Sequence, residues 1–205
     1  MTPQQYVAVV PVKPPGEGKT RLGDLPDPVR ARLAAGFALD TVAACLAASP
    51  VVAVVVVTDE SAWARAAVEL GAVLLPDPGR GLNGALVAGA VLAASRWPQA
   101  VPVAVLADLP ALRSDDLASC LAGAAGRAAY VADAEGTGTT LYTAPYDEFA
   151  PRFGPGSAAA HAATGAVPLD ASDAVRRDVD TLADWHAAMA FGVGAHSRNA
   201  WPSTT

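Results

Sequence analysis

The chain has 205 residues, of which 52% are hydrophobic, 17% charged and 6% aromatic, and its formal net charge is −6. This length and apolar content suit one α/β domain with a sizeable core. The acidic balance argues against nonspecific nucleic-acid binding and against an anionic membrane surface as partner. A phosphate site would therefore be a local cationic feature on an acidic protein.

The first predicted element is a buried strand that runs into a loop rich in glycine and cations. Residues 6–12 read YVAVVPV, an apolar run suited to a strand covered on both faces. Residues 13–21 contain Lys13, Lys19 and Arg21 together with two prolines and two glycines. Cations beside exposed backbone amides suit a polyphosphate group.

Two other interpretations of this loop stay open when it is considered alone. One is a Walker A P-loop, because residues 18–20 (GKT) match the end of that motif. The spacing disfavours it, since Lys13 stands where the motif begins with glycine and the two prolines that follow lack N–H groups. The other is a solvated surface loop whose charges keep the protein soluble.

Further along the chain, helices and strands alternate. Strands are predicted at 51–58, 72–75, 101–107, 128–132 and 141–144. Helices are predicted at about 27–48, 63–70, 85–95, 115–123, in an alanine-rich segment around His161, and at 182–191. This alternation is typical of a single-domain α/β protein with a mostly parallel, Rossmann-like sheet.

A glycine-rich segment and the carboxyl-terminal tail carry expectations of their own. Residues 79–84 read GRGLNG and are expected to form a loop between a strand and a helix, a place where anionic or nucleotide ligands collect. A plain turn is the alternative. The single domain is expected to span 1–205, with residues 192–205 as a mobile tail.

The cysteines and the amino terminus bear on location. Cys45 and Cys120 lie in alanine-rich helical segments and are expected to be reduced core residues of a cytoplasmic protein, with a disulfide as the alternative. The first residues carry no basic patch, which is not the pattern of a signal peptide. Residues 51–57 are apolar but too few to span a membrane.

Candidate carboxylates occur at two places in the sequence. Asp108 comes just past the strand at 101–107, where open α/β sheets place ligands, although it could equally cap a loop. Asp178 and Asp180 flank Val179 and share a face of an extended chain, with a helix N-cap as the alternative for Asp180. Carboxylates that converge beside phosphate favour Mg²⁺, a hard metal that prefers oxygen ligands.

Two glycine-containing loops, residues 136–140 and 154–157, supply hydroxyls and amides without charge. The Ser157 hydroxyl suits one phosphate or carboxylate, with an ordinary serine N-cap as the alternative. His161 and His186 are expected to be surface or packing residues. The chain shows no Ser/His/Asp arrangement and no metal-binding Cys/His spacing, which disfavours a hydrolase of those types.

Taken together, these pieces resemble the guanylyltransferase family of deazaflavin coenzyme F-420 biosynthesis, whose members join GMP from GTP to phosphoenolpyruvate or 2-phospho-L-lactate. The resemblance runs from Val7 to about Gly194, through VPVKPPGEGKTRL, the Leu82-Asn83 turn, LADLPAL, GTGTT, RFGPGS and RRDVDTLADW. Residues 14–17 depart from the family, in which small residues are usual. The family fold is a nucleotidyltransferase variant of the α/β sheet, of the nucleotide-diphospho-sugar transferase-like type.

The resemblance implies a charged half of the site. Asp108 and Asp180 would hold Mg²⁺, and Lys13 would lie near the phosphates or the acceptor. Lys19 and Arg21 would lie along the GTP triphosphate. The mechanism it implies is an in-line attack by the acceptor phosphate on the α-phosphorus of GTP, which needs no strong general base.

The resemblance also implies an uncharged half. Thr139, Gly154 and Ser157 would surround the phosphoenolpyruvate, and Asn83 would lie near the nucleoside. The expected partners are GTP and a small phosphorylated three-carbon acid, with no nucleic acid and no membrane; a homodimer is left open. The alternatives are another nucleotidyltransferase of this fold, such as a molybdenum-cofactor guanylyltransferase, or a noncatalytic nucleotide-binding regulator.

Overall fold

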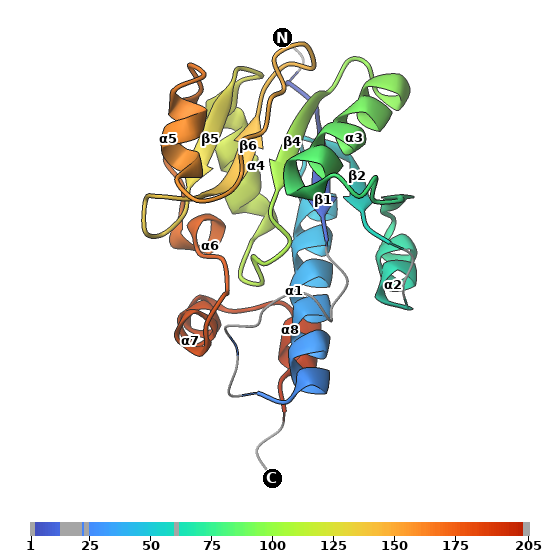
Figure 1. Cartoon of the computed structure of the whole chain (residues 1–205), viewed down its shortest axis with the longest axis vertical. Helices are drawn as coiled ribbons and strands as arrows, with labels where there is room; N and C mark the ends of the chain where they lie inside the picture. The colour runs from blue at the N-terminus through green and yellow to red at the C-terminus, as the bar shows by residue number, and fades with distance from the viewer. Residues whose placement is uncertain (1–2, 13–21, 23–24, 60–61, 203–205) are drawn as a thin grey trace.

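The computed structural model describes residues 3–12, 22, 25–59 and 62–202. Its centre is a seven-stranded sheet in the order β3-β2-β1-β4-β6-β5-β7, with helices on both faces (Figure 1). The strands are β1 (Tyr6–Pro11), β2 (Val51–Val57), β3 (Val73–Leu75), β4 (Val101–Val105), β5 (Ala129–Ala132), β6 (Thr139–Thr143) and β7 (Val167–Pro168). Only β6 runs antiparallel to its neighbours among these strands, so the predicted mostly parallel α/β sheet is confirmed.

The helices of the described chain differ from the prediction mainly at their ends. They are α1 (Asp27–Ala47), α2 (Ala62–Leu70), α3 (Gly81–Arg96), α4 (Ser114–Ala124), α5 (Ser157–Ala162), α6 (Asp173–Arg176), α7 (Leu182–Phe191) and α8 (Ala195–Ala200). α7 has the predicted bounds, whereas α6 and α8 were not predicted. α3 begins at Gly81, so most of the expected loop at 79–84 is the first turn of a helix.

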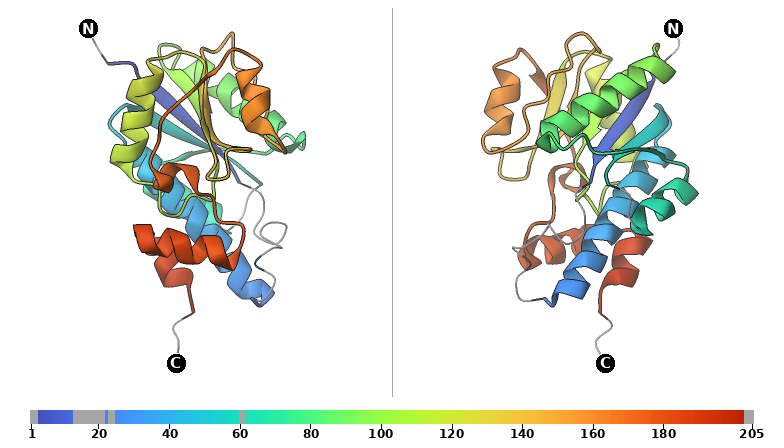
Figure 2. Two further views of the ribbon diagram at one scale, coloured as in Figure 1. Left: turned by 90° about the vertical axis from the view of Figure 1, so that its left-hand side faces the viewer. Right: turned by 45° about the vertical axis from the view of Figure 1, so that its right-hand side comes forward.

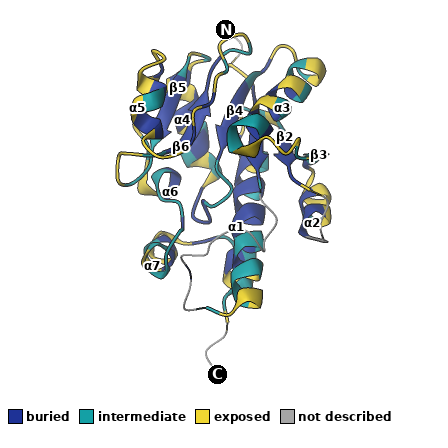
Figure 3. Ribbon diagram, viewed as in Figure 1, coloured by how far each residue is buried: buried dark blue, intermediate teal, exposed yellow. Residues whose placement is uncertain are grey.

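The sheet separates two apolar cores. All six residues of β1 are buried, as a strand covered on both faces requires (Figure 3). Tyr6, Ala8 and Val10 pack on the side of α1, α2 and α4, whereas Val7 and Val9 pack on the side of α3 and α5 (Figure 2). Because side chains alternate along β1, this strand contributes to the apolar cores on both faces of the sheet.

A third apolar cluster holds the carboxyl-terminal helices below the sheet. Its members come from the start of α1, from α6 and α7 and from the segments around them. Trp185 of α7 stacks between Phe37 of α1 and Trp201, with ring centroids 5.4 and 5.2 Å away. Val179, which lies between two of the predicted site aspartates, is fully buried in this cluster.

The expectation of a mobile tail at 192–205 is wrong for its described part. α8 lies alongside α1 (Figure 1), where the buried carboxylate of Asp40 accepts hydrogen bonds from the backbone N–H groups of His196 (3.1 Å) and Ser197 (2.8 Å). A carboxylate from α1 thus caps the amino terminus of α8, which satisfies N–H groups that a helix leaves unpaired.

The order of the strands places a ligand crevice. The chain passes from β1 to β2 and β3 on one side, then crosses to β4 on the other side of β1. In open α/β sheets, ligands bind at the carboxyl ends of the strands where this reversal occurs. Asp108 follows β4 at this edge. The predicted cationic loop at 13–21 follows β1 and lies outside the described residues.

Both cysteines are free and buried, so the expected reduced core thiols are confirmed and the disulfide is not formed. Burial raises the pKa of the Cys45 thiol to about 12 and that of Cys120 to about 11. Among the described helices, none is long and apolar enough to cross a membrane.

Gly89 marks a close contact between α3 and the sheet. A methyl group added at Gly89 would overlap Cγ1 of Val9 and lie 3.1 Å from Cγ2 of Val57. Both valines are fully buried and β-branched, so neither can rotate away cheaply.

We expect Gly89→Ala to lower the free energy of unfolding by about 1–3 kcal/mol, because overpacking outweighs the gain of alanine over glycine in a helix. Gly123→Ala in α4 is the matched control, since its added methyl group would meet Leu169 at an ordinary 3.7 Å. Urea denaturation of both variants measures the difference. Equal stability of the two variants would contradict the close packing of α3 on β1.

Candidate active site

Asp108 is held by backbone contacts at the end of β4. The Leu106 N–H donates to the Thr140 carbonyl (3.0 Å) on β6. The Leu109 N–H donates to the Thr41 hydroxyl of α1 (3.3 Å), and the Leu109 side chain is fully buried. Asp108 therefore lies between two anchored residues, as expected of a site residue at a strand end.

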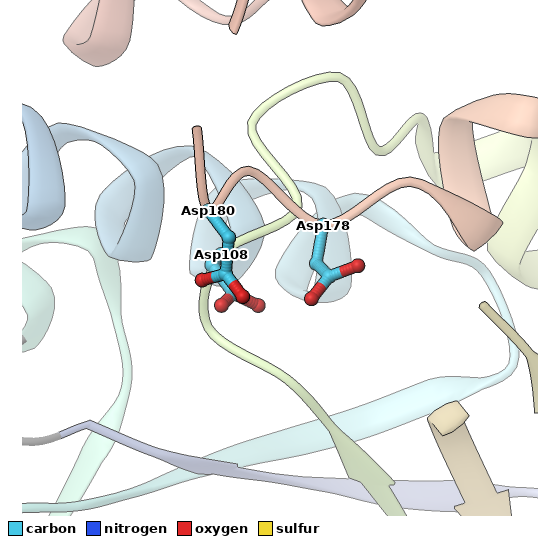
Figure 4. A group of neighbouring side chains, drawn as sticks. All are labelled: Asp108, Asp178 and Asp180. Carbon is cyan, nitrogen blue, oxygen red and sulfur yellow. The ribbon is translucent and has the colours of Figure 1, made fainter. Parts of the chain in front are cut away.

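Val179 brings two more aspartates to Asp108. Its backbone N–H donates to the Asp108 carbonyl (3.0 Å), while its side chain is buried in the third cluster. The neighbours Asp178 and Asp180 project to the other side of the segment. Figure 4 shows the three carboxylates side by side, and one oxygen from each lies within 4.8 Å of those from the other two.

The start of α7 shows that Asp180 is not the N-cap of this helix. Thr181 is the N-cap of α7, and its hydroxyl accepts the Asp184 N–H (3.2 Å). Asp184 accepts in return from the Thr181 N–H (2.8 Å), which completes a capping box. Because Thr181 caps the helix, Asp180 is left to face Asp108.

A cavity of about 440 Å³ connects the aspartates with the uncharged loops. It is lined by Leu82, Leu106, Asp133, Thr137, Gly138, Thr139, Phe153, Gly154, Pro155, Gly156, Ser157, Asp178 and Asp180. The predicted acceptor residues Thr139, Gly154 and Ser157 are thus brought together from β6, a loop and the start of α5, beside the acidic cluster.

Asp133 shapes one loop of the cavity. Its carboxylate accepts hydrogen bonds from the N–H groups of Thr137 (2.9 Å) and Gly138 (2.7 Å). A methyl group at Gly138 would overlap the Asp133 carboxylate, so only glycine allows this close approach. Arg176 anchors the same region by donating to the Asp133 carbonyl (2.9 Å).

Asn83 holds the opposite loop. Its side-chain amide donates to the Phe153 carbonyl (2.9 Å) and its side-chain oxygen accepts the Phe153 N–H (2.9 Å). This reciprocal pair fixes the backbone just before Gly154. Asn83 also lines a second, more apolar hollow of about 710 Å³ beside α3. Its predicted place near the nucleoside stays a prediction, and its contact with Phe153 was not anticipated.

His161 is fully buried, so the prediction of a packing residue holds and that of a surface residue is wrong. Its ring stacks on Tyr142 with centroids 4.4 Å apart. Its Nε2 accepts the Arg152 N–H (2.9 Å), and its Nδ1 lies 3.0 Å from the Thr139 hydroxyl oxygen. Sequence patterns gave no sign of these contacts, because His161 meets partners from β6 and from the loop before α5.

Burial lowers the pKa of His161 to about 4, an effect to which the charge of Arg152 adds and which a hydrogen bond to the Ser157 backbone opposes. The ring is therefore neutral at pH 7. It contacts a predicted acceptor residue without carrying charge.

The site residues predicted from the sequence, apart from Asn83, fall into three groups. Asp108 and Asp180 are brought together, and Asp178, whose role the resemblance did not specify, joins them. The acceptor residues line the adjoining cavity. Lys13, Lys19 and Arg21 lie outside the described residues.

The fold resembles that of solved nucleotidyltransferases. A solved structure from Desulfovibrio desulfuricans, assigned as a nucleotide-diphospho-sugar transferase, superposes with a TM-score of 0.65 at 18% identity, covering 90% of this chain and 86% of that one. The structure of 4-diphosphocytidyl-2C-methyl-D-erythritol synthase superposes with a TM-score of 0.63 at 12% identity, covering 93% and 99%. At these identities the likeness shows the fold.

The family follows from more similar sequences. The family described as guanylyl transferase CofC like matches residues 6–201, and the chain belongs to it. Phosphoenolpyruvate guanylyltransferase of Streptomyces scabiei is 51% identical over 200 residues, which cover 93% of this chain and 93% of that protein. The enzyme of the same name from Thermomonospora curvata is 50% identical over 191 residues, covering 91% and 84%.

These comparisons confirm the resemblance read from the sequence. The chain is an enzyme of the guanylyltransferase class, so the alternative of a noncatalytic nucleotide-binding regulator is set aside.

The neutral, buried ring of His161 predicts a specific pH dependence of stability. Because its pKa falls from an ordinary 6.5 to about 4 on folding, the unfolded chain binds the proton more tightly. The free energy of unfolding is therefore unaffected by protonation of this histidine above pH 6.5. As the pH falls from 6.5 towards 4, protonation of the unfolded chain lowers that free energy by up to about 3 kcal/mol.

We expect the free energy of unfolding of the wild type to fall more steeply between pH 6.5 and 4.5 than that of His161→Asn. Urea denaturation at several pH values measures both slopes, and comparing slopes removes any constant loss of stability in the variant. Parallel pH profiles would mean that His161 titrates normally in the folded protein.

Proposed function

We propose that the protein transfers GMP from GTP to phosphoenolpyruvate and releases pyrophosphate, as a step in coenzyme F-420 biosynthesis. The observation that carries this proposal is the cavity in which an acidic cluster adjoins uncharged loops, in a chain about half identical to two phosphoenolpyruvate guanylyltransferases. The acceptor is the part of the proposal that the names of these relatives support and the geometry alone does not specify.

The reaction joins two anions. An oxygen of the acceptor phosphate would form a bond to the α-phosphorus of GTP, while the bond from that phosphorus to the bridging oxygen breaks and the electron pair leaves with pyrophosphate. An anionic phosphate is already a nucleophile, so no side chain has to remove a proton. The described cavity suits this chemistry, because its one histidine neighbour, His161, is buried and neutral.

The acidic cluster fits a hard divalent cation, and we propose Mg²⁺ there. Asp108 and Asp180 would hold it, with Asp178 as a third oxygen ligand. Oxygens that share one Mg²⁺ lie about 3–4 Å apart at its usual bond lengths, so oxygens within 4.8 Å need only small side-chain rotations. When bound, the ion would neutralise charge on the phosphates of the nucleotide.

The uncharged loops of the cavity would bind the acceptor substrate. The hydroxyls of Thr139 and Ser157 and the backbone at Gly154 would bind the anionic groups of phosphoenolpyruvate. Lys13, Lys19 and Arg21 remain the cations predicted for the phosphates. A location in the cytoplasm, without nucleic acid or membrane as partner, and assembly as a homodimer stay predictions.

A pyrophosphate-release assay tests the function. We expect the highest kcat/KM with GTP and phosphoenolpyruvate, when GTP, ATP and CTP are each paired with phosphoenolpyruvate, 2-phospho-L-lactate and 3-phosphoglycerate. A higher kcat/KM with 2-phospho-L-lactate would replace the acceptor but keep the reaction. Silence with every pair, in a folded protein supplied with Mg²⁺, would refute the proposed function.

The aspartates give a second prediction. Asp108→Asn and Asp180→Asn should each lower kcat by about a hundredfold or more, and Asp178→Asn should also reduce kcat and raise the Mg²⁺ concentration for half-maximal rate. Asp147→Asn is the control, because Asp147 is exposed and does not line the cavity. Circular dichroism checks the fold of each variant. If Asp180→Asn turns over like Asp147→Asn, the metal assignment is wrong.

A further inference from the structure

His161 has two hydrogen-bonding nitrogens, and the structure fixes the role of each. Nε2 lies 2.9 Å from the backbone nitrogen of Arg152. A backbone N–H can only donate, so Nε2 accepts and carries no proton. A neutral imidazole holds one ring proton, which must therefore be on Nδ1.

The protonated Nδ1 determines what Thr139 can do. The Thr139 hydroxyl oxygen lies 3.0 Å from Nδ1, so it accepts a hydrogen bond there. The Ser157 backbone also interacts with the ring. The proton on Nδ1 can be donated to either of these two acceptors. In both cases the Thr139 hydroxyl cannot donate to Nδ1, because that nitrogen is already protonated.

The hydroxyl hydrogen of Thr139 is thus available for another acceptor. In the part of the chain that the structure describes, this hydroxyl forms its hydrogen bond with His161. Thr139 lines the cavity together with Gly154 and Ser157. A ligand in this cavity that accepts hydrogen bonds would meet a donor at Thr139.

We propose that His161 is a positioning residue that fixes the Thr139 hydroxyl as a hydrogen-bond donor for the anionic acceptor substrate, an inference that rests on the proposed function. The carboxylate and phosphate of phosphoenolpyruvate can only accept hydrogen bonds at neutral pH. A hydroxyl alone can rotate and present either polarity, whereas one that accepts from His161 is set for an anion before the substrate arrives.

The surroundings of the ring support this role. His161 is fully buried, stacks on Tyr142 and meets the edge of Phe153 with centroids 5.2 Å apart, so the imidazole cannot easily flip. Its contact with the Arg152 N–H also ties the loop that carries Gly154 to the same ring. One side chain therefore orders two of the predicted acceptor contacts. Burial also keeps the ring neutral, because it lowers the pKa to about 4.

The first test is the tautomer itself, measured on the wild-type protein by ¹⁵N NMR of histidine-labelled samples at pH 7. His161→Asn assigns the His161 signals among the three histidines of the chain. We expect a protonated Nδ1 and an unprotonated Nε2. The opposite tautomer, or a doubly protonated ring, would overturn the proposal whatever the enzyme's substrate is.

The second test compares two amide replacements that keep different halves of the ring. His161→Asn keeps a donor near Nδ1, whereas His161→Gln keeps an acceptor near Nε2 and loses the donor. We expect His161→Gln to raise KM for phosphoenolpyruvate about tenfold while KM for GTP changes less than twofold. His161→Asn keeps the donor to Thr139 but loses the contact with the Arg152 N–H, so it should raise KM for phosphoenolpyruvate by less than His161→Gln does and leave KM for GTP little changed.

A purely structural role predicts a different pattern. It would make both variants lose thermal stability and affect GTP and phosphoenolpyruvate alike. Thr139→Val supplies the coupling test, because adding His161→Gln to it should raise KM for phosphoenolpyruvate no further. Independent, multiplying effects of the two substitutions would overturn the proposal.

Isothermal titration calorimetry with phosphoenolpyruvate separates this proposal from the proposed function. Wild type that binds phosphoenolpyruvate but releases no pyrophosphate with any nucleotide would refute the function alone. Equal affinities of His161→Gln and His161→Asn for phosphoenolpyruvate would refute the positioning role alone. Absence of binding by the wild type would refute both.

Discussion

The site depends on one buried residue between two charged ones. The side chain of Val179 is fully buried in the third apolar cluster, and its N–H donates to the Asp108 carbonyl at 3.0 Å. Burying a valine contributes about 1.5–3 kcal/mol and a hydrogen bond about 1 kcal/mol. Repulsion between each pair of the three carboxylates, whose oxygens lie within 4.8 Å of one another, is about 1–3 kcal/mol. The anchor therefore offsets part of the repulsion within the acidic cluster, and a bound cation would reduce that repulsion further.

The uncharged half of the cavity is built on a different principle. Each of its loops is held by a side chain that forms hydrogen bonds with the backbone or with a hydroxyl. Asp133 bonds to Thr137 and Gly138, Asn83 bonds to Phe153, and His161 bonds to Arg152 and Thr139. These contacts leave the donors of the loops oriented before any ligand binds. Preorganised donors bind an anion without the cost of ordering the loop.

The sequence predicted what depends on local pattern and not what depends on distant contacts. Apolar runs gave the strands, and α7 begins at the predicted residue, although its N-cap is Thr181 and not Asp180. α8 was missed because its cap, Asp40, lies 156 residues from His196. Asp108 was singled out because it follows a predicted strand, and Asp180 because it lies beside Val179 in an extended segment. The contacts of His161 were not, because a histidine in an alanine-rich segment looks the same whether or not it has partners.

In the proposed function, the two halves of the cavity would divide the recognition of substrates between them. Charge in the acidic cluster can attract a metal–nucleotide complex but cannot tell one three-carbon phospho-acid from another, because phosphoenolpyruvate and 2-phospho-L-lactate have the same charged groups and differ in whether C2 and C3 are planar or tetrahedral. That difference would be read by the spacing of neutral donors on the loops. Hydrogen bonds from the side chains of Asn83, Asp133 and His161 hold these loops. Acceptor specificity within such a site would therefore depend on the residues that hold the loops as much as on Thr139, Gly154 and Ser157, which line the cavity.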